Sequence, residues 1–216
     1  MFGAAMLAAC GSVEGGANEA QARSSGTTRK LDVAGVRPGM SAAEARTVLE
    51  RQGWRVDTVR GQSWEEMVAY EAERRRNGRP DYSRRSGIEA LEATKGDENL
   101  EVKVHPVPGG AAVSVVNYTS PLAGRSQDQL RADMISRYGT PDRSSPAGAP
   151  IDMTYCTGEA RCTSAFGAGK TALGVGIQSG VNLRINLLEG FEAERAWRAS
   201  FDHAVLASTG GGGRSF

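Results

Sequence analysis

The chain has 216 residues and a net charge of +1, from 26 basic and 25 acidic residues. This balance argues against a nucleic-acid-binding protein, which needs a strong basic excess. After Cys10 no apolar run approaches the roughly 18 residues of a membrane-spanning helix. The length suits one or two small domains with a real hydrophobic core.

Residues 1–9 are uncharged and mostly apolar, and small residues precede the cysteine in Leu7-Ala8-Ala9-Cys10. The run has the length of a signal-peptide core and is too short to cross a bilayer. The pattern resembles the lipobox of bacterial lipoproteins, which are cleaved before the cysteine and acylated on it. That resemblance implies a signal peptide at 1–9 and a lipid anchor on Cys10. Because Gly11, and not Asp, follows the cysteine, it also implies the outer membrane.

The start of the chain leaves two interpretations open. Signal peptides open with basic residues, yet no Lys or Arg precedes Arg23. Residues 1–9 are therefore either a signal peptide whose natural start lies upstream, which we expect, or a small apolar terminus. Residues 10–30 are rich in Gly, Ser and Ala and predict a flexible tether, and residues 209–216 predict a disordered tail.

Three Ser-x-x-Glu/Gln capping boxes predict helices that begin after Ser41, Ser63 and Ser126. A glycine, or Asn before Gly, marks the end of each helix. These predicted ends are Gly53, Asn77-Gly78 and Gly139, and a final helix is predicted over residues 191–206.

The remaining segments predict strands. Residues 100–105 alternate as Leu-Glu-Val-Lys-Val-His, which is the pattern of a half-buried strand. Residues 106–110 then predict a turn, while residues 88–94 fit either a strand or a helix. Further strands are predicted over residues 111–118, 151–156, 162–166, 171–178 and 181–188.

This order of elements predicts an α+β fold, in which antiparallel β-meanders have helices packed on one face. Residues 31–120 and 121–208 each read as a helix followed by a meander. We therefore expect two degenerate copies of one unit, the second without the inner helix.

The opening Val36-Arg37-Pro38-Gly39-Met40-Ser41-Ala42-Ala43-Glu44-Ala45 resembles that of SmpA/OmlA (BamE-like) outer-membrane lipoproteins. The helix end Tyr138-Gly139-Thr140-Pro141 is similar to the Leu-Gly-x-Pro of the same family. Beta-lactamase inhibitor proteins share this small α+β unit in tandem. The matching residues are mostly capping and turn residues, so they carry information on fold more than on function. The resemblance implies an envelope lipoprotein that works by binding other proteins.

Cys156 and Cys162 lie close in the sequence, near the ends of two predicted strands. In an oxidising compartment this spacing predicts a disulfide across a hairpin loop. A zinc site would need two further ligands, and the two histidines, His105 and His203, have no metal-binding spacing. Free thiols are the remaining alternative.

A cluster of arginines, which we call the arginine cluster, follows the second predicted helix. It suggests contact with an anionic partner such as lipid headgroups, glycan phosphates or an acidic protein. The alternative is a solvated helix face, because Glu71 and Arg75 stand at ion-pair spacing. The cluster comprises Arg74, Arg75, Arg76, Arg79, Arg84 and Arg85.

The sequence contains only weak motifs for ligand binding or catalysis. Residues 164–171, Ser-Ala-Phe-Gly-Ala-Gly-Lys-Thr, partly match a phosphate-binding loop, but a strand and not the required helix is predicted next. His105 and His203 lie in no recognisable catalytic motif. We therefore expect no enzyme activity, no cofactor and no metal.

Taken together, these features predict a lipid-anchored protein on the periplasmic face of the envelope. Its expected role is non-catalytic binding or scaffolding, with an envelope protein as partner. One alternative is an enzyme inhibitor, which would carry exposed aromatic side chains on the open face of the sheet. The other is a hydrolase, which would hold His105 or His203 next to a Ser or Asp in a pocket.

Overall fold

A computed structural model describes residues 29–76, 78–80, 83–157 and 171–210. Helices and strands are mixed along these residues, and the fold is α+β, as predicted. The elements are, in chain order, α1 (Ala42–Arg51), β1 (Arg55–Gly61), α2 (Trp64–Arg75), β2 (Gly87–Lys95), β3 (Glu98–Val107), β4 (Gly110–Pro121), α3 (Gln127–Tyr138), β5 (Arg143–Ser144), β6 (Asp152–Cys156), β7 (Ala172–Gln178), β8 (Asn182–Leu188) and α4 (Phe191–Gly210).

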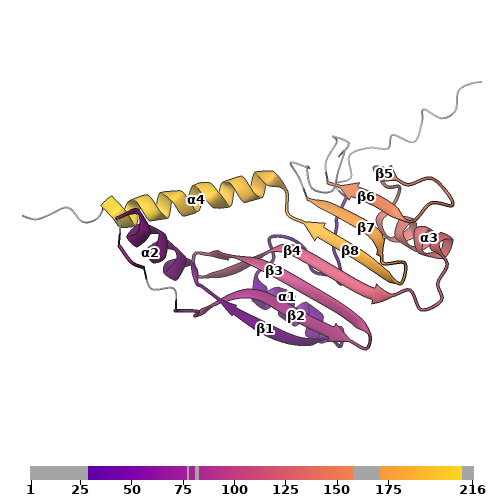
Figure 1. The fold of residues 1–216 in the computed structure, drawn as a ribbon, viewed down its shortest axis with the longest axis horizontal. Helices are drawn as coiled ribbons and strands as arrows, with labels where there is room; N and C mark the ends of the chain where they lie inside the picture. The colour runs from indigo at the N-terminus through magenta and orange to yellow at the C-terminus, as the bar shows by residue number, and fades with distance from the viewer. Residues whose placement is uncertain (1–28, 77, 81–82, 158–170, 211–216) are drawn as a thin grey trace, which may run out of the picture.

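The strands of the described residues join in one antiparallel sheet, in the order β1-β2-β3-β4-β8-β7-β6-β5. The sheet contains two meanders, β1–β4 and β5–β8, whose last strands pair with each other (Figure 1). Helix α1 precedes the first meander and α3 precedes the second. Only the first meander has an inserted helix, α2, between its first two strands. The two predicted meanders therefore form one continuous sheet.

Each of α1, α2 and α3 begins with its predicted capping box. The side chains of Ser41, Ser63 and Ser126 each accept a hydrogen bond from the N–H three residues later, and the Glu or Gln there accepts one in return. Gly53 and Gly139 follow α1 and α3 with φ of +83° and +78°, a conformation that glycine adopts without strain. These local interactions explain why the helix boundaries could be predicted from short motifs.

Two strands were not predicted. Strand β1 contains only Val56 and Val59 as apolar residues, because a strand at the edge of a sheet buries little surface. Strand β5 has two residues, too few for any pattern. Residues 88–94, for which both a strand and a helix remained open, lie within strand β2.

Two predicted boundaries differ from the structure. Strand β3 runs through Pro106, which pairs with Ala111, so the turn predicted over 106–110 is confined to residues 108–109. Proline lacks a backbone N–H and so removes one hydrogen-bond donor from the strand pairing. The pairing nevertheless continues beyond Pro106 to Val107, which lies opposite Gly110. Helix α4 continues to Gly210, past the predicted end at residue 206 and into the predicted tail. The strand predicted over 162–166 lies outside the described residues.

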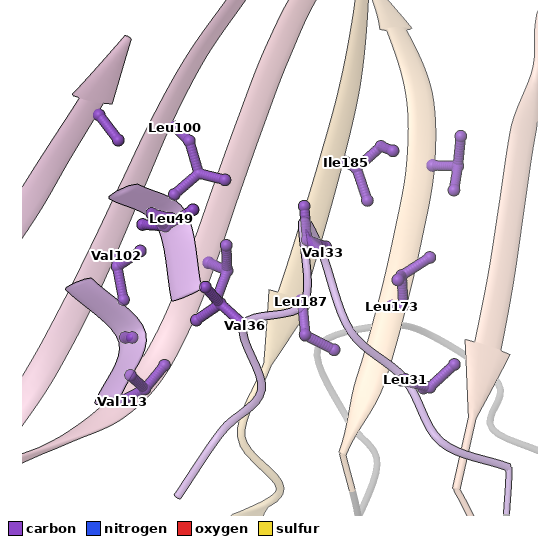
Figure 2. Close-up of a cluster of buried hydrophobic side chains, with 14 of the residues drawn as sticks. Leu31, Val33, Val36, Leu49, Leu100, Val102, Val113, Leu173, Ile185 and Leu187 are labelled. Atoms are coloured by element: carbon purple, nitrogen blue, oxygen red, sulfur yellow. The ribbon is translucent and has the colours of Figure 1, made fainter. Parts of the chain in front are cut away.

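The hydrophobic core lies on one face of the sheet. A row of fully buried residues crosses β3, β4, β8 and β7 at Val102, Val116, Leu187 and Leu173. Leu49 of α1 belongs to the same core cluster and lies over Leu100 and Val102 (Figure 2). Burial of one such side chain contributes about 1.5–3 kcal/mol. Because the row crosses the β4–β8 junction, it stabilises both meanders together.

The segment before α1 crosses the core side of the sheet from the second meander to the first. Leu31, Val33 and Val36 are buried and lie over β7, β8 and β4 (Figure 2). The hydroxyl of Tyr138 donates to the carbonyl of Asp32 at 2.9 Å, which fixes the segment to α3. Arg29, inside the predicted tether, forms an ion pair of 2.8 Å with Asp142.

Helices α2 and α4 pack together beyond the β3–β4 hairpin (Figure 1). Trp197 of α4 stacks on Phe201 with ring centroids 5.5 Å apart and meets Trp64 of α2 edge-on at 6.4 Å. Its indole N–H donates to the carbonyl of Pro106 at 2.8 Å. This aromatic group attaches α4 to α2 and to the end of the sheet.

Candidate functional site

The face of the sheet opposite the core, which we call the open face, carries mainly polar, charged and small residues. At its β6–β7 end Thr154, Cys156 and Ala172 are buried. Its residues alternate along each strand with the core residues. One row in register crosses every strand of the sheet order. It consists of Asp57, Glu92, Glu101, Asn117, Asn186, Gly174, Thr154 and Arg143.

Two neighbouring hollows of about 380 and 420 Å³ lie on the open face, and Gln178 and Arg184 line both. The first lies over β5–β8 and has Gly174 and Gly176 among its lining residues. The second lies over β2–β4 and is lined by Glu92 and other polar residues. No aromatic residue appears among the described residues that line these hollows. Together they form a shallow surface of mixed polar and apolar character along much of the sheet.

Gly176 of strand β7 has no evident role in folding. It is absent from the residues with positive φ, so its backbone conformation is open to any residue. Among the described residues, a Cβ atom on Gly176 would meet nothing closer than the carbonyl oxygen of Ile151 at 3.7 Å, an ordinary contact. Glycine within a strand costs about 0.5–1 kcal/mol relative to alanine. Gly176 leaves the β7 backbone without a side chain beneath the first hollow, where another molecule could approach closely.

The charges of the open face are mostly paired. Arg55 lies 3.6 Å from Asp57, and Lys103 lies 3.7 Å from Glu101. Arg143 forms an ion pair of 3.3 Å with Asp152. Glu92 and Arg184 form no ion pair with any described residue, and both side chains are exposed. They are therefore the charges of this face that a partner could neutralise.

The six residues of the arginine cluster fall into two groups, one at the end of α2 and one between α2 and β2. Arg74 and Arg75, in the last turn of α2, contact Glu71 at 2.6 and 2.9 Å, and Arg75 also contacts Asp202 of α4 at 2.7 Å. Arg76 donates to the carbonyl of Ser208. The contacts of Arg75 with Asp202 and of Arg76 with Ser208 connect α2 to α4, which was not predicted. The pair of Arg75 with Glu71 within α2 has the spacing on which the alternative of a solvated helix face was based. The remaining arginines, Arg79, Arg84 and Arg85, lie between α2 and β2. Binding of an anionic partner by the cluster stays a prediction.

Hydrogen bonds from Arg74, and then from Arg75, lower the pKa of Glu71 to about 2 from 4.5. Burial opposes this shift but is the smaller effect. Glu71 therefore remains a carboxylate at any physiological pH and holds both guanidinium groups on α2.

The histidines lie apart from one another. His105 of β3 stacks on Trp197 with centroids 4.8 Å apart, and its Nε2 lies 3.4 Å from Oε2 of Glu189. His203 is exposed on α4. The contacts described for His105 are to a glutamate and a ring, and not to the Ser or Asp that the hydrolase alternative requires. Within the described ranges, no group of three or more His, Cys, Asp or Glu is placed to hold a metal ion.

Several predicted features lie wholly or partly outside the described residues. Cys10 and Cys162 lie outside the described residues, and Cys156 is the last residue of β6. Lipidation and the disulfide therefore stay predictions. Residues 164–170, which belong to the partial match to a phosphate-binding loop, also lie outside the described residues. After Thr171 the chain forms strand β7, as expected, where a phosphate-binding loop needs a helix.

No protein-family model matches this chain, and neither curated proteins nor solved structures give a significant match. The resemblance to SmpA/OmlA lipoproteins and to beta-lactamase inhibitor proteins therefore stays a prediction. In the part of the chain that the structure describes, no helix has both the length and the apolar character needed to cross a bilayer.

The sequence analysis did not identify the open face as a site. One local signal was present, the Gly174-Val175-Gly176 alternation inside a predicted strand. Glycine in a strand often marks close approach by another backbone or a ligand. Arg184 gave no local signal, because its neighbours Thr119 and Gly176 come from two other strands.

Proposed function

We propose that this protein is a non-catalytic binding module whose open face binds a partner protein. The observation that carries the proposal is the open position above Gly176 in the first hollow. This glycine weakens a strand without serving its backbone conformation. A partner that lies close against β7 explains its presence.

The character of the open face favours a protein as the occupant. Its charges are balanced in sign, whereas nucleic acids and anionic membranes require a basic surface. The two hollows adjoin through Gln178 and Arg184, so they offer an extended surface of mixed polar and apolar character and not an enclosed small-molecule pocket. Amide side chains such as Asn117 and Asn186 supply donors and acceptors suited to a protein interface.

We also propose that the module is anchored in the envelope by a lipid on Cys10. The apolar run before this cysteine and the polar, Gly-rich residues after it support the proposal. Several acyl chains on one residue would hold the protein firmly at a membrane, while a single chain would hold it weakly. Mass spectrometry of the mature N-terminus tests this directly: an acylated Cys10 is expected, and an unmodified N-terminus upstream of it would contradict the anchor.

No specific observation favours the two alternative functions. The inhibitor alternative depends on exposed aromatic side chains, and none of the described residues that line the two hollows is aromatic. The hydrolase alternative depends on His105 or His203 next to a Ser or Asp in a pocket. His105 contacts Glu189 and Trp197, and His203 is exposed on α4.

Site-specific photo-crosslinking in cells that make the protein tests the proposal. A photoreactive residue would replace Gln178, which lines both hollows. The control replaces Asp133, an exposed residue of α3 on the core side of the sheet. We expect a discrete adduct with another protein from position 178 and none of that mass from position 133.

A second substitution connects this adduct to the hollow. Gly176→Val fills the first hollow, and Gly110→Val is its matched control, since a Cβ on Gly110 meets nothing within 4 Å. The adduct should be lost in Gly176→Val and retained in Gly110→Val. The proposal fails if position 178 gives no adduct, or if the adduct survives in Gly176→Val.

A further inference from the structure

Arg184 lies near the centre of the open face, and its guanidinium group is only partly used by the described residues. Its neighbours in the sequence, Leu183 and Ile185, are buried in the core, so its side chain projects from the opposite face. Its Nε donates to Oδ1 of Asn186 at 3.1 Å, which orients the group. Neither terminal nitrogen of Arg184 has a partner among the described residues. A pair of free, parallel N–H donors is the arrangement that binds a carboxylate in bidentate fashion.

The residues around Arg184 leave room for such a carboxylate. In register across the sheet, Thr119 stands on one side of Arg184, and Gly176 and then Asp152 stand on the other. Asp152 is the nearest acidic residue in this row, and its carboxylate pairs with Arg143 at 3.3 Å. Because residue 176 is glycine, no side chain projects from that position between Arg184 and Asp152 in the register of the described strands. Arg184, Asp152 and Arg143 all line the first hollow, which therefore holds two guanidinium groups and one carboxylate.

We propose that this position receives a carboxylate side chain, Asp or Glu, of the partner protein, bound by the guanidinium of Arg184. The inference rests on the proposed function and names the chemistry by which the open face recognises its partner. One added carboxylate brings the group formed by Arg143, Asp152 and Arg184 to neutrality. The glycine allows the partner backbone to lie close enough for a short acidic side chain to reach the guanidinium.

Side-chain NMR tests the chemistry without the partner. The probe is N-acetyl-glutamate N-methylamide, and its uncharged control is the glutamine analogue. We expect the Nε–Hε signal of Arg184 to shift with the glutamate compound at concentrations that leave Arg55 unchanged. Arg55 is the internal control, since it is exposed on the same face but lies on β1 beside Asp57. Equal shifts with the glutamine analogue, or equal shifts at Arg55, would overturn carboxylate recognition.

The photo-crosslink from position 178 tests the role of Arg184 in the cell. Arg184→Gln should reduce the adduct at least tenfold, and Arg55→Gln should leave it within twofold of the unsubstituted protein. An adduct that persists in Arg184→Gln would refute the inference while leaving the proposed function standing. The absence of any adduct in the unsubstituted protein would instead refute the proposed function itself.

Discussion

At the scale of single residues, the glycines of this sheet fall into two groups with opposite expected behaviour. Gly87 lies where a Cβ would come within 2.4 Å of the carbonyl oxygen of Gln62, so its backbone is too close to another for any side chain. Gly176 has an open position above it. The first glycine serves the fold, and we attribute the second to binding.

Gly176→Val should therefore leave the free energy of unfolding unchanged or raise it by about 1 kcal/mol, since valine favours strands. Gly87→Ala should lower it by more than about 1 kcal/mol, because backbone atoms must move. Urea unfolding of both variants measures the difference. A clear loss of stability in Gly176→Val would show that this glycine serves the fold after all.

Glu71 predicts a pH dependence of the α2–α4 contact. Its folded-state pKa of about 2 lies below the unfolded value of 4.5. The stabilisation is thus fully present above pH 4.5 and is lost as the pH falls toward 2. Glu71→Gln should lower the melting temperature at neutral pH, and the difference from the unsubstituted protein should shrink below pH 4.5. Glu73→Gln on the same helix is the control, and a pH-independent effect of Glu71→Gln would contradict the assignment.

At the scale of elements, local signals decided what could be predicted. The capping boxes at Ser41, Ser63 and Ser126 lie within three residues of the helices they start, so the sequence alone was sufficient. Strand alternation likewise revealed β3 and β8. Strand β1 was missed because an edge strand with two valines has almost no pattern.

The candidate site was harder to predict than the elements. The open face exists because β4 pairs with β8, two strands more than sixty residues apart in the sequence, as with Thr119 opposite Arg184. No short motif encodes that pairing, which depends on burial of the whole core. The arginine cluster attracted attention by its charge, yet Arg74 pairs with Glu71 within α2, and Arg75 and Arg76 contact α4.

Helix α4 depends on its aromatic contacts. Trp197→Ala removes the stacking on Phe201 and His105 and the hydrogen bond to Pro106. We expect it to lower the free energy of unfolding by about 2–4 kcal/mol. Leu206→Ala, on a side chain that is 60% exposed, should change it by less than about 0.5 kcal/mol. Urea denaturation compares the two, and equal effects would show that α4 is not held by its aromatic face.

At the scale of the whole molecule, the continuous sheet predicts one cooperative unit. Leu187 of β8 is fully buried at the junction with β4. Leu187→Ala should cost about 2–5 kcal/mol. Hydrogen exchange should then become faster in β2 and β3 as well as in β6 and β7, by a similar factor. Faster exchange confined to β5–β8 would show that the two meanders unfold separately.

The central claim is that the open face is covered by a partner protein in the cell. Carboxyl footprinting tests it most directly, by comparing the labelling of Glu92 on the open face with that of Asp133 on α3 in purified protein and in intact cells. The account predicts that Glu92 is protected in cells while Asp133 is labelled equally in both. Equal labelling of Glu92 in the two preparations would contradict it.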